Sequence, residues 1–167
     1  YPDALAYLED ALAIVRRRGS RTGEWLVLAE TTYPLYMLGR WEEALVTAAD
    51  VPEEKLSTAM TMSLLASVLE IRIHRGDTPE AQRLLSLFAH LANTTDVQDR
   101  SFYQGATAVV FRAEGRFAET LTAGVEAAEA SSKLFDMCTQ TVKQGLVEAI
   151  EAALALDVPL EDLGIGD

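Results

Sequence analysis

Apolar residues recur along most of the chain at intervals of three and four positions, with polar residues between them. This spacing places the apolar side chains on one face of an α-helix, whereas a half-buried strand would alternate apolar and polar residues. Ala, Leu, Glu and Arg dominate, and Val and Ile never form alternating runs. We therefore predict an all-α chain, with helices at about 2–18, 23–38, 41–50, 55–75, 79–93, 96–114, 117–132 and 134–156.

Three segments of the chain share a pattern centred on a glycine. They read LGRWEEAL at 38–45, RGDTPEAQ at 75–82 and EGRFAETL at 114–121, so that their glycines are 37 and 39 residues apart. A glycine can take the left-handed conformation that ends one helix, and the polar residue or proline after it begins the next. The pattern predicts helical hairpins in three full repeats, with partial copies at 1–5 and 156–161.

Two other segments indicate where helices begin or are interrupted. Pro34 lies inside the predicted helix 23–38, where its missing N–H and its ring cost about 3 kcal/mol, so we expect a kink or a break near Tyr33. The run Thr95-Asp96-Val97-Gln98 has the spacing of a capping box, which predicts that a new helix begins there.

The chain has a two-helix repeat of about 37 to 40 residues, marked by the segments LGRWEEAL and RGDTPEAQ. This repeat resembles the tetratricopeptide repeat (TPR) family. The resemblance covers nearly the whole chain. It implies a right-handed α-α superhelix of stacked helical hairpins, forming one domain over residues 1–167. The chain departs from the family in its longer period, in Thr120 where an alanine is expected, and in Arg72 where an aromatic residue is customary.

These departures are similar to the looser repeats that follow the ATP-binding or cyclase domains of large bacterial signalling and transcriptional regulators. The resemblance therefore implies a non-catalytic protein-protein interaction module. Since the sequence begins at Tyr1 and not at methionine, we expect it to be a piece of such a longer bacterial protein. Its partner would be a protein or peptide, or another domain of the same parent chain.

The charge and the hydropathy of the chain argue against two classes of partner, nucleic acid and membrane. With 14 Lys and Arg against 26 Asp and Glu, the formal charge of −12 repels phosphate backbones and anionic membranes, so neither nucleic acid nor membrane is expected as a partner. No apolar run approaches the roughly 18 residues of a membrane span, no leader opens the chain, and Cys138 is its single cysteine. These features predict a cytoplasmic protein.

One basic cluster departs from this acidic composition. It comprises Arg16, Arg17, Arg18 and Arg21, at the end of the first predicted helix. Cations there complement the negative end of the helix dipole. An anion-docking patch is the alternative.

No residues form a recognisable catalytic, cofactor or metal site. His74 and His90 are expected at opposite ends of one helical hairpin, too far apart to share a metal ion, and Cys138 is interpreted as a small buried residue rather than a nucleophile. Acid-base chemistry needs carboxylates that converge in a cleft. We instead expect solvated helix faces for the pairs Glu42/Glu43, Glu126/Glu129 and Glu148/Glu151. The sequence thus predicts no enzyme, no cofactor and no metal.

The first helix of each repeat lines the concave side of a helical solenoid, so its inward residues are candidates for a binding groove. The alternative is that the apolar members pack between neighbouring hairpins. Helical spacing from each glycine gives the candidates Tyr33, Tyr36, Met37, Glu70, His74, Phe102, Arg112 and Lys143.

Some members of the family bind the acidic C-terminal tail of a chaperone, whose carboxylate contacts a set of Lys, Arg and Asn residues. That set is missing here, because Asn93 falls in a loop and the matching positions hold Ser67 and Ala106. No chaperone-tail binding is therefore expected.

Self-association is the alternative function. The last predicted helix carries Leu146, Ile150 and Leu154 at helical spacing and has no following partner helix. Such a helix can expose an apolar face to a second copy of the chain.

Overall fold

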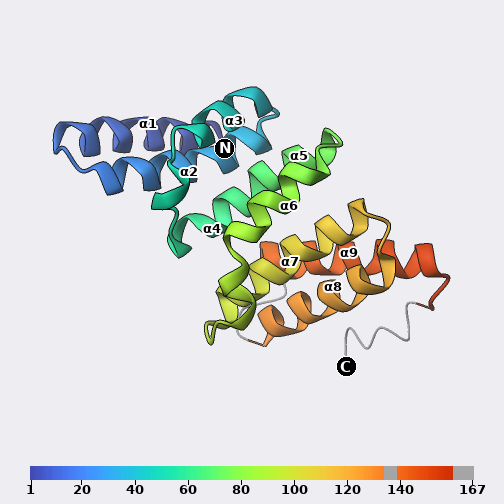
Figure 1. Cartoon of the computed structure of the whole chain (residues 1–167). Helices are drawn as coiled ribbons and strands as arrows, with labels where there is room; N and C mark the ends of the chain where they lie inside the picture. Colours follow the sequence, from blue (N-terminus) through green and yellow to red (C-terminus); the bar gives the residue numbers. More distant parts are fainter. Residues whose placement is uncertain (134–138, 160–167) are drawn as a thin grey trace. The chain divides into compact units, whose positions relative to one another are not determined.

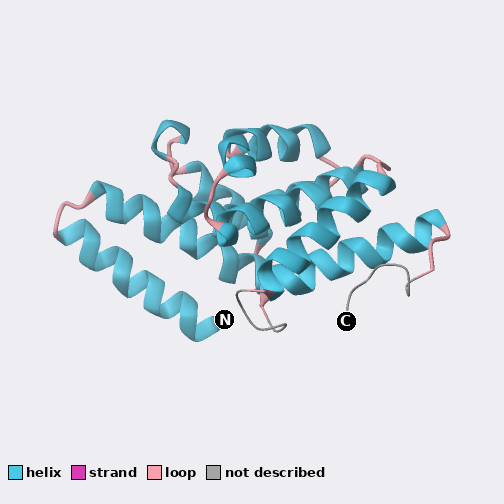
Figure 2. Cartoon of the chain, turned by 90° about the horizontal axis from the view of Figure 1, so that it is seen from below, coloured by secondary structure: helices cyan, strands magenta, loops and turns pink. Residues whose placement is uncertain are grey.

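The computed structural model describes residues 1–133 and 139–159 (Figure 1). Every regular element in these residues is helical (Figure 2), which confirms the predicted all-α class. The α-helices are α1 (Pro2–Arg17), α2 (Arg21–Met37), α3 (Trp41–Ala49), α4 (Thr58–Leu64), α5 (Glu70–His74), α6 (Thr78–Leu87), α7 (Val97–Ala113), α8 (Phe117–Ser132) and α9 (Gln140–Leu156). Short elements join them: the 3-10 turns η1 (Glu53–Lys55) and η3 (Ala89–Asn93), and the π-helical turn η2 (Leu65–Leu69).

Of the kink or break predicted near Tyr33, the break is wrong, because α2 continues through Pro34 to Met37, whereas the kink stays a prediction. Tertiary packing offsets the cost of the ring: Thr32, Pro34 and Leu35 are all buried, and α2 contacts α1, α3 and α4.

Two other predicted boundaries also shift. The predicted helix 55–75 begins only at Thr58 and contains a π turn, and the predicted helix 79–93 changes to a 3-10 turn after Leu87. The start expected at 134 lies outside the described residues.

The chain divides into two compact units, a first unit (Tyr1–Arg75) and a second unit (Gly76–Asp167), which are described separately. The single domain expected over 1–167 stays a prediction. In the first unit, α2 is the central helix, against which α1, α3 and α4 pack. Its core includes Leu5 of α1, Leu35 of α2, Ala44 of α3 and Ile71 of α5, which are all at least 93% buried.

In the second unit, α7, α8 and α9 each contact the other two, and α6 and η3 rest on α7. Helices α8 and α9 approach each other closely where Gly124 faces Gly145. A Cβ atom on Gly124 would lie 2.7 Å from the carbonyl oxygen of Gly145, and a Cβ on Gly145 would lie 2.6 Å from that of Gly124. The two backbones can meet this closely only because both residues lack a side chain.

Two of the three predicted glycine turns, at Gly39 and Gly115, have one backbone geometry, which confirms the predicted turns at these positions. Gly39 and Gly115 have φ angles of 72° and 74°. After Gly39, the N–H of Arg40 donates to Leu35, and the N–H of Arg116 donates in the same way to Phe111. Both arginines then pair with the glutamate three residues further on, Glu43 or Glu119.

The same turn follows α9, although no glycine is present there. Asp157 takes the left-handed conformation with φ 60°, and the N–H of Val158 donates to the carbonyl of Ala153 at 2.9 Å. The partial copy predicted at 156–161 therefore keeps the backbone turn as far as the structure describes it.

Gly115→Ala is expected to lower the free energy of unfolding by about 1 kcal/mol. No atom lies within 4 Å of a Cβ built on Gly115, so the loss comes from the left-handed backbone alone. Urea unfolding monitored by circular dichroism measures it. An unchanged or raised stability would contradict this interpretation of the turn.

Candidate functional site

Five aromatic rings of the first unit form a continuous series, which we call the aromatic row: Tyr1, Tyr33, Tyr36, Trp41 and His74. Successive ring centroids are 6.1, 6.5, 6.2 and 5.6 Å apart, and the last two contacts are stacked. These distances fall within the range of favourable aromatic pairs. The row therefore joins residues that lie far apart in the sequence into one surface.

Local sequence explains how the row forms. Tyr33 and Tyr36 are three residues apart on α2, so they share one helix face. The turn at Gly39 reverses the chain and brings Trp41, the first residue of α3, back against Tyr36. His74 is the last residue of α5, and its ring stacks on Trp41 with an interplanar angle of 18°.

The row is anchored on one side and accessible on the other. Tyr36 and Trp41 are partly buried and pack against the core cluster of the first unit, whereas Tyr1 is 53% exposed and the His74 side chain is 47% exposed. Rings held by a packed base lose little conformational freedom when a partner binds them. The arrangement is thus a preorganised surface that mixes apolar and polar groups.

One carboxylate, that of Glu70, lies beside the row. Glu70 on α5 is 3.9 Å from His74 Nε2, and its side chain is only 13% exposed. Burial, followed by the negative charge of Glu70, raises the pKa of Tyr36. Carboxylates next to aromatic faces favour a cationic group of a ligand.

Two tyrosines of the row, Tyr33 and Tyr36, are expected to ionise late. Burial, reinforced by neighbouring Tyr1, raises the pKa of Tyr33 to about 12, whereas an unfolded tyrosine ionises near 10. Since the folded state holds the proton more tightly, stability should fall as the pH rises from about 10 toward 12. Tyrosinate absorbance in an alkaline titration measures this. Ionisation of every tyrosine in one step near pH 10, before unfolding, would contradict it.

Of the predicted groove residues, Tyr33, Tyr36, Glu70 and His74 come together in the first unit. Met37 is on the same helix α2 and is 43% exposed. The remaining candidates lie in the second unit: partly buried Phe102, Arg112 and exposed Lys143. Whether all eight line one groove stays a prediction.

Sequence reasoning missed two members of the row, Tyr1 and Trp41. The signal for Trp41 was its place directly after the Gly39 turn, which folds the chain back onto α2. Tyr1 caps the start of α1, and no sequence spacing relates it to Tyr33.

Arg112 is engaged within the second unit. Its Nε donates to Glu148 Oε2 at 2.6 Å, and a second guanidinium nitrogen donates to Glu148 Oε1 at 3.1 Å. The Glu148 side chain is 4% exposed, so the predicted solvated face is wrong for this residue. A buried carboxylate on α9 requires such a bidentate partner, and α7 supplies it.

The other predicted carboxylate pairs do not converge on a shared site. Glu42 pairs with Arg75 and Glu43 with Arg40, while Glu126 accepts from Gln104 and Glu129 pairs with Lys133. These partners are cations or amides at the surface. These four glutamates therefore lie on exposed helix surfaces, as the sequence predicts.

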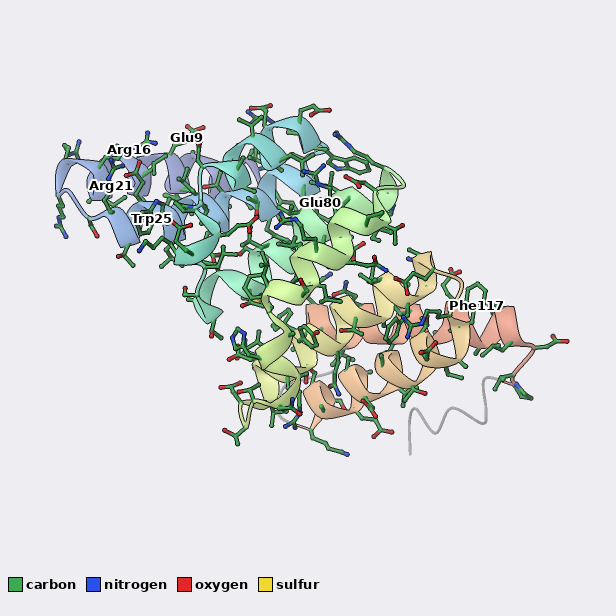
Figure 3. The ribbon with its side chains drawn as sticks, viewed as in Figure 1. Glu9, Arg16, Arg21, Trp25, Glu80 and Phe117 are labelled. Carbon is green, nitrogen blue, oxygen red and sulfur yellow. The ribbon has the colours of Figure 1, made fainter. Side chains whose placement is uncertain are left out.

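The basic cluster at the end of α1 is partly neutralised. Figure 3 labels Arg16 and Arg21, and both pair with Glu24 on α2, at 2.8 and 3.0 Å. These hydrogen bonds, chiefly that of Arg16, lower the pKa of Glu24. Arg16 and Arg17 also lie in the last turn of α1, which supports the helix-end interpretation of the cluster.

Within residues 1–133 and 139–159, no three His, Cys, Asp or Glu side chains come together as a metal site. The same residues include no helix that is long and apolar enough to cross a membrane. Cys138 lies outside them.

Comparisons of the chain with protein-family models, curated proteins and solved structures find no match. The function of the chain is therefore inferred from the geometry of its two units.

Proposed function

We propose that the chain is a non-catalytic protein-protein interaction module of a larger bacterial signalling or regulatory protein. The observation that carries this proposal is the aromatic row, whose rings are partly exposed on packed helices. Tyr and Trp are enriched among the residues that dominate binding energy at protein interfaces. A partner peptide or domain would place apolar groups against Tyr33 and Tyr36.

The proposal includes a TPR-like arrangement, in which the hairpins stack into a right-handed superhelix. Its support is the glycine turn with its i,i+3 Arg–Glu pair, which recurs after α2 and after α7. Stacked repeats of this kind bury a continuous core between neighbours and leave extended surfaces for partners. Cytoplasmic location belongs to the same proposal.

The test is a calorimetric titration of the chain with the remaining domains of its parent protein. Tyr33→Ala is expected to weaken binding about tenfold or more, the effect of losing one interface anchor. Tyr7→Ala is the matched control, because Tyr7 is a 75% exposed tyrosine on α1 outside the row. Equal affinity of the Tyr33→Ala and Tyr7→Ala variants would place the binding surface elsewhere.

Self-association is a second candidate, favoured by one observation. Of the three residues predicted for this face of α9, Ile150 and Leu154 are 38% and 65% exposed, whereas Leu146 is half-buried. Val147, at helical spacing from both, is 55% exposed. Light scattering over a range of concentrations tests this candidate. A mass of one chain throughout would exclude it.

A further inference from the structure

A groove of about 330 Å³ lies wholly within the second unit, between α7 and α8. Tyr103, Gln104 and Phe111 of α7 line one side, and Glu119 and Glu126 of α8 line the other. Both charged residues that line it are glutamates. The groove thus combines aromatic surface with negative charge.

At the end of the groove lined by Phe111 and Glu119, a guanidinium from the chain itself already contacts both of these residues. Arg116 lies over the ring of Phe111, with its Cζ atom 3.9 Å from the ring centroid. Its Nε donates to Glu119 at 2.8 Å, and NH1 donates to Glu114 at 2.8 Å. At this end, an aromatic ring and a glutamate together bind a guanidinium group.

The other end has the same components without a cation. Glu126 lies seven residues after Glu119, about 10 Å further along α8. It accepts a hydrogen bond from Gln104 Nε2 at 2.8 Å, and no cation of the described residues pairs with it. The buried Gln104 Oε1 has no hydrogen-bond donor among the described residues. The Glu126 carboxylate is therefore left for an external cation, and a rotation of the Gln104 amide would present its oxygen to the same ligand.

The charge of the second unit favours the same class of ligand. This unit holds fifteen Asp and Glu against six Lys and Arg, a formal charge of −9 out of the chain's −12. Such a field attracts basic segments and repels acidic ones.

We propose that the Glu126 end of this groove binds an arginine side chain of a partner protein. The planar guanidinium can donate to the Glu126 carboxylate and to the Gln104 oxygen while it lies against Tyr103. Its apolar stem follows the wall of the groove. This proposal rests on the proposed interaction function, for which it specifies one contact. The contact lies in the second unit, whereas the aromatic row lies in the first.

The experiment titrates the chain with the peptide acetyl-Ala-Gly-Arg-Gly-Ala-amide and records amide chemical shifts by NMR. Matched peptides carry lysine or the neutral isostere citrulline instead of arginine. We expect the arginine peptide to bind with a Kd of about 1 mM or tighter and to shift the amides of Gln104 and Glu126. The lysine peptide should bind several-fold more weakly, and the citrulline peptide should cause no saturable shift.

Glu126→Gln should weaken binding of the arginine peptide at least fivefold. Glu129→Gln, which removes the same charge one turn away beside Lys133, should change it less than twofold. Equal binding of the citrulline or lysine peptide, shifts confined to other residues, or unchanged affinity in the Glu126→Gln variant would overturn the proposal. A negative result for arginine binding would not affect the Tyr33→Ala test of the aromatic row, so each proposal can be overturned without the other.

Discussion

Gly145→Ala is expected to lower the free energy of unfolding by about 3 kcal/mol or more. The added Cβ would lie 2.6 Å from the carbonyl oxygen of Gly124 and 2.9 Å from the backbone nitrogen of Ala128. Both are backbone atoms, so no side-chain rotation relieves the overlap, and α8 and α9 must move apart. Buried alanines on both helices, such as Ala127 and Ala149, would then lose contacts.

Gly105→Ala is the matched control for this substitution. Gly105 is also a buried helical glycine, but the nearest atom to its Cβ would be Gln144 Oε1, at an ordinary 3.7 Å. Alanine in a helix is favoured over glycine, so this variant should be unchanged or up to about 1 kcal/mol more stable. Urea unfolding by circular dichroism compares the two. Similar stability of both variants would contradict the close helix crossing.

Both tryptophans, Trp25 and Trp41, lie in the first unit, which adds a second readout. Gly145→Ala acts in the second unit. Its effect should therefore appear more strongly in circular dichroism than in tryptophan fluorescence whenever the units unfold separately.

Arg112→Ala is expected to cost about 3 kcal/mol, the second large effect. The substitution leaves the carboxylate of Glu148 without its bidentate partner, in a side chain that is only 4% exposed. Glu148→Gln should cost less, since Arg112 is 33% exposed and water can solvate its charge. Chemical unfolding of both variants measures the difference.

Arg40→Ala is the control for the buried pair. Arg40 forms the same kind of bond with Glu43, but both side chains are well exposed, at 43% and 57%. Exposed pairs contribute at most about 1 kcal/mol. Losses of equal size for Arg112→Ala and Arg40→Ala would show that burial of Glu148 does not matter for stability.

Much of the fold follows from local sequence rules, and the exceptions have physical causes. The helices and the left-handed turns at Gly39 and Gly115 could be predicted, because both depend on residues close in sequence. The uninterrupted helix at Pro34 was not, because burial of Thr32 and Leu35 by other helices decides it. Nor does the local sequence predict the π turn η2.

The residues of the candidate site also fall into those that local sequence predicts and those that only tertiary packing brings together. Tyr33 and Tyr36 follow from their spacing on one helix, and the register relative to Gly76 also selected Glu70 and His74. Trp41 and Glu148 were missed, since their roles depend on which helices pack together: the Arg112–Glu148 pair spans 36 residues. Long-range partners of this kind become visible only in the packed chain.

Small-angle X-ray scattering of the chain tests most directly whether its helical hairpins stack into an open superhelix. A compact domain of 167 residues has a radius of gyration of about 15 Å. The proposal predicts a clearly larger value at the mass of one chain, with a distance distribution skewed toward long distances. A single chain near 15 Å with a symmetrical distribution would contradict it.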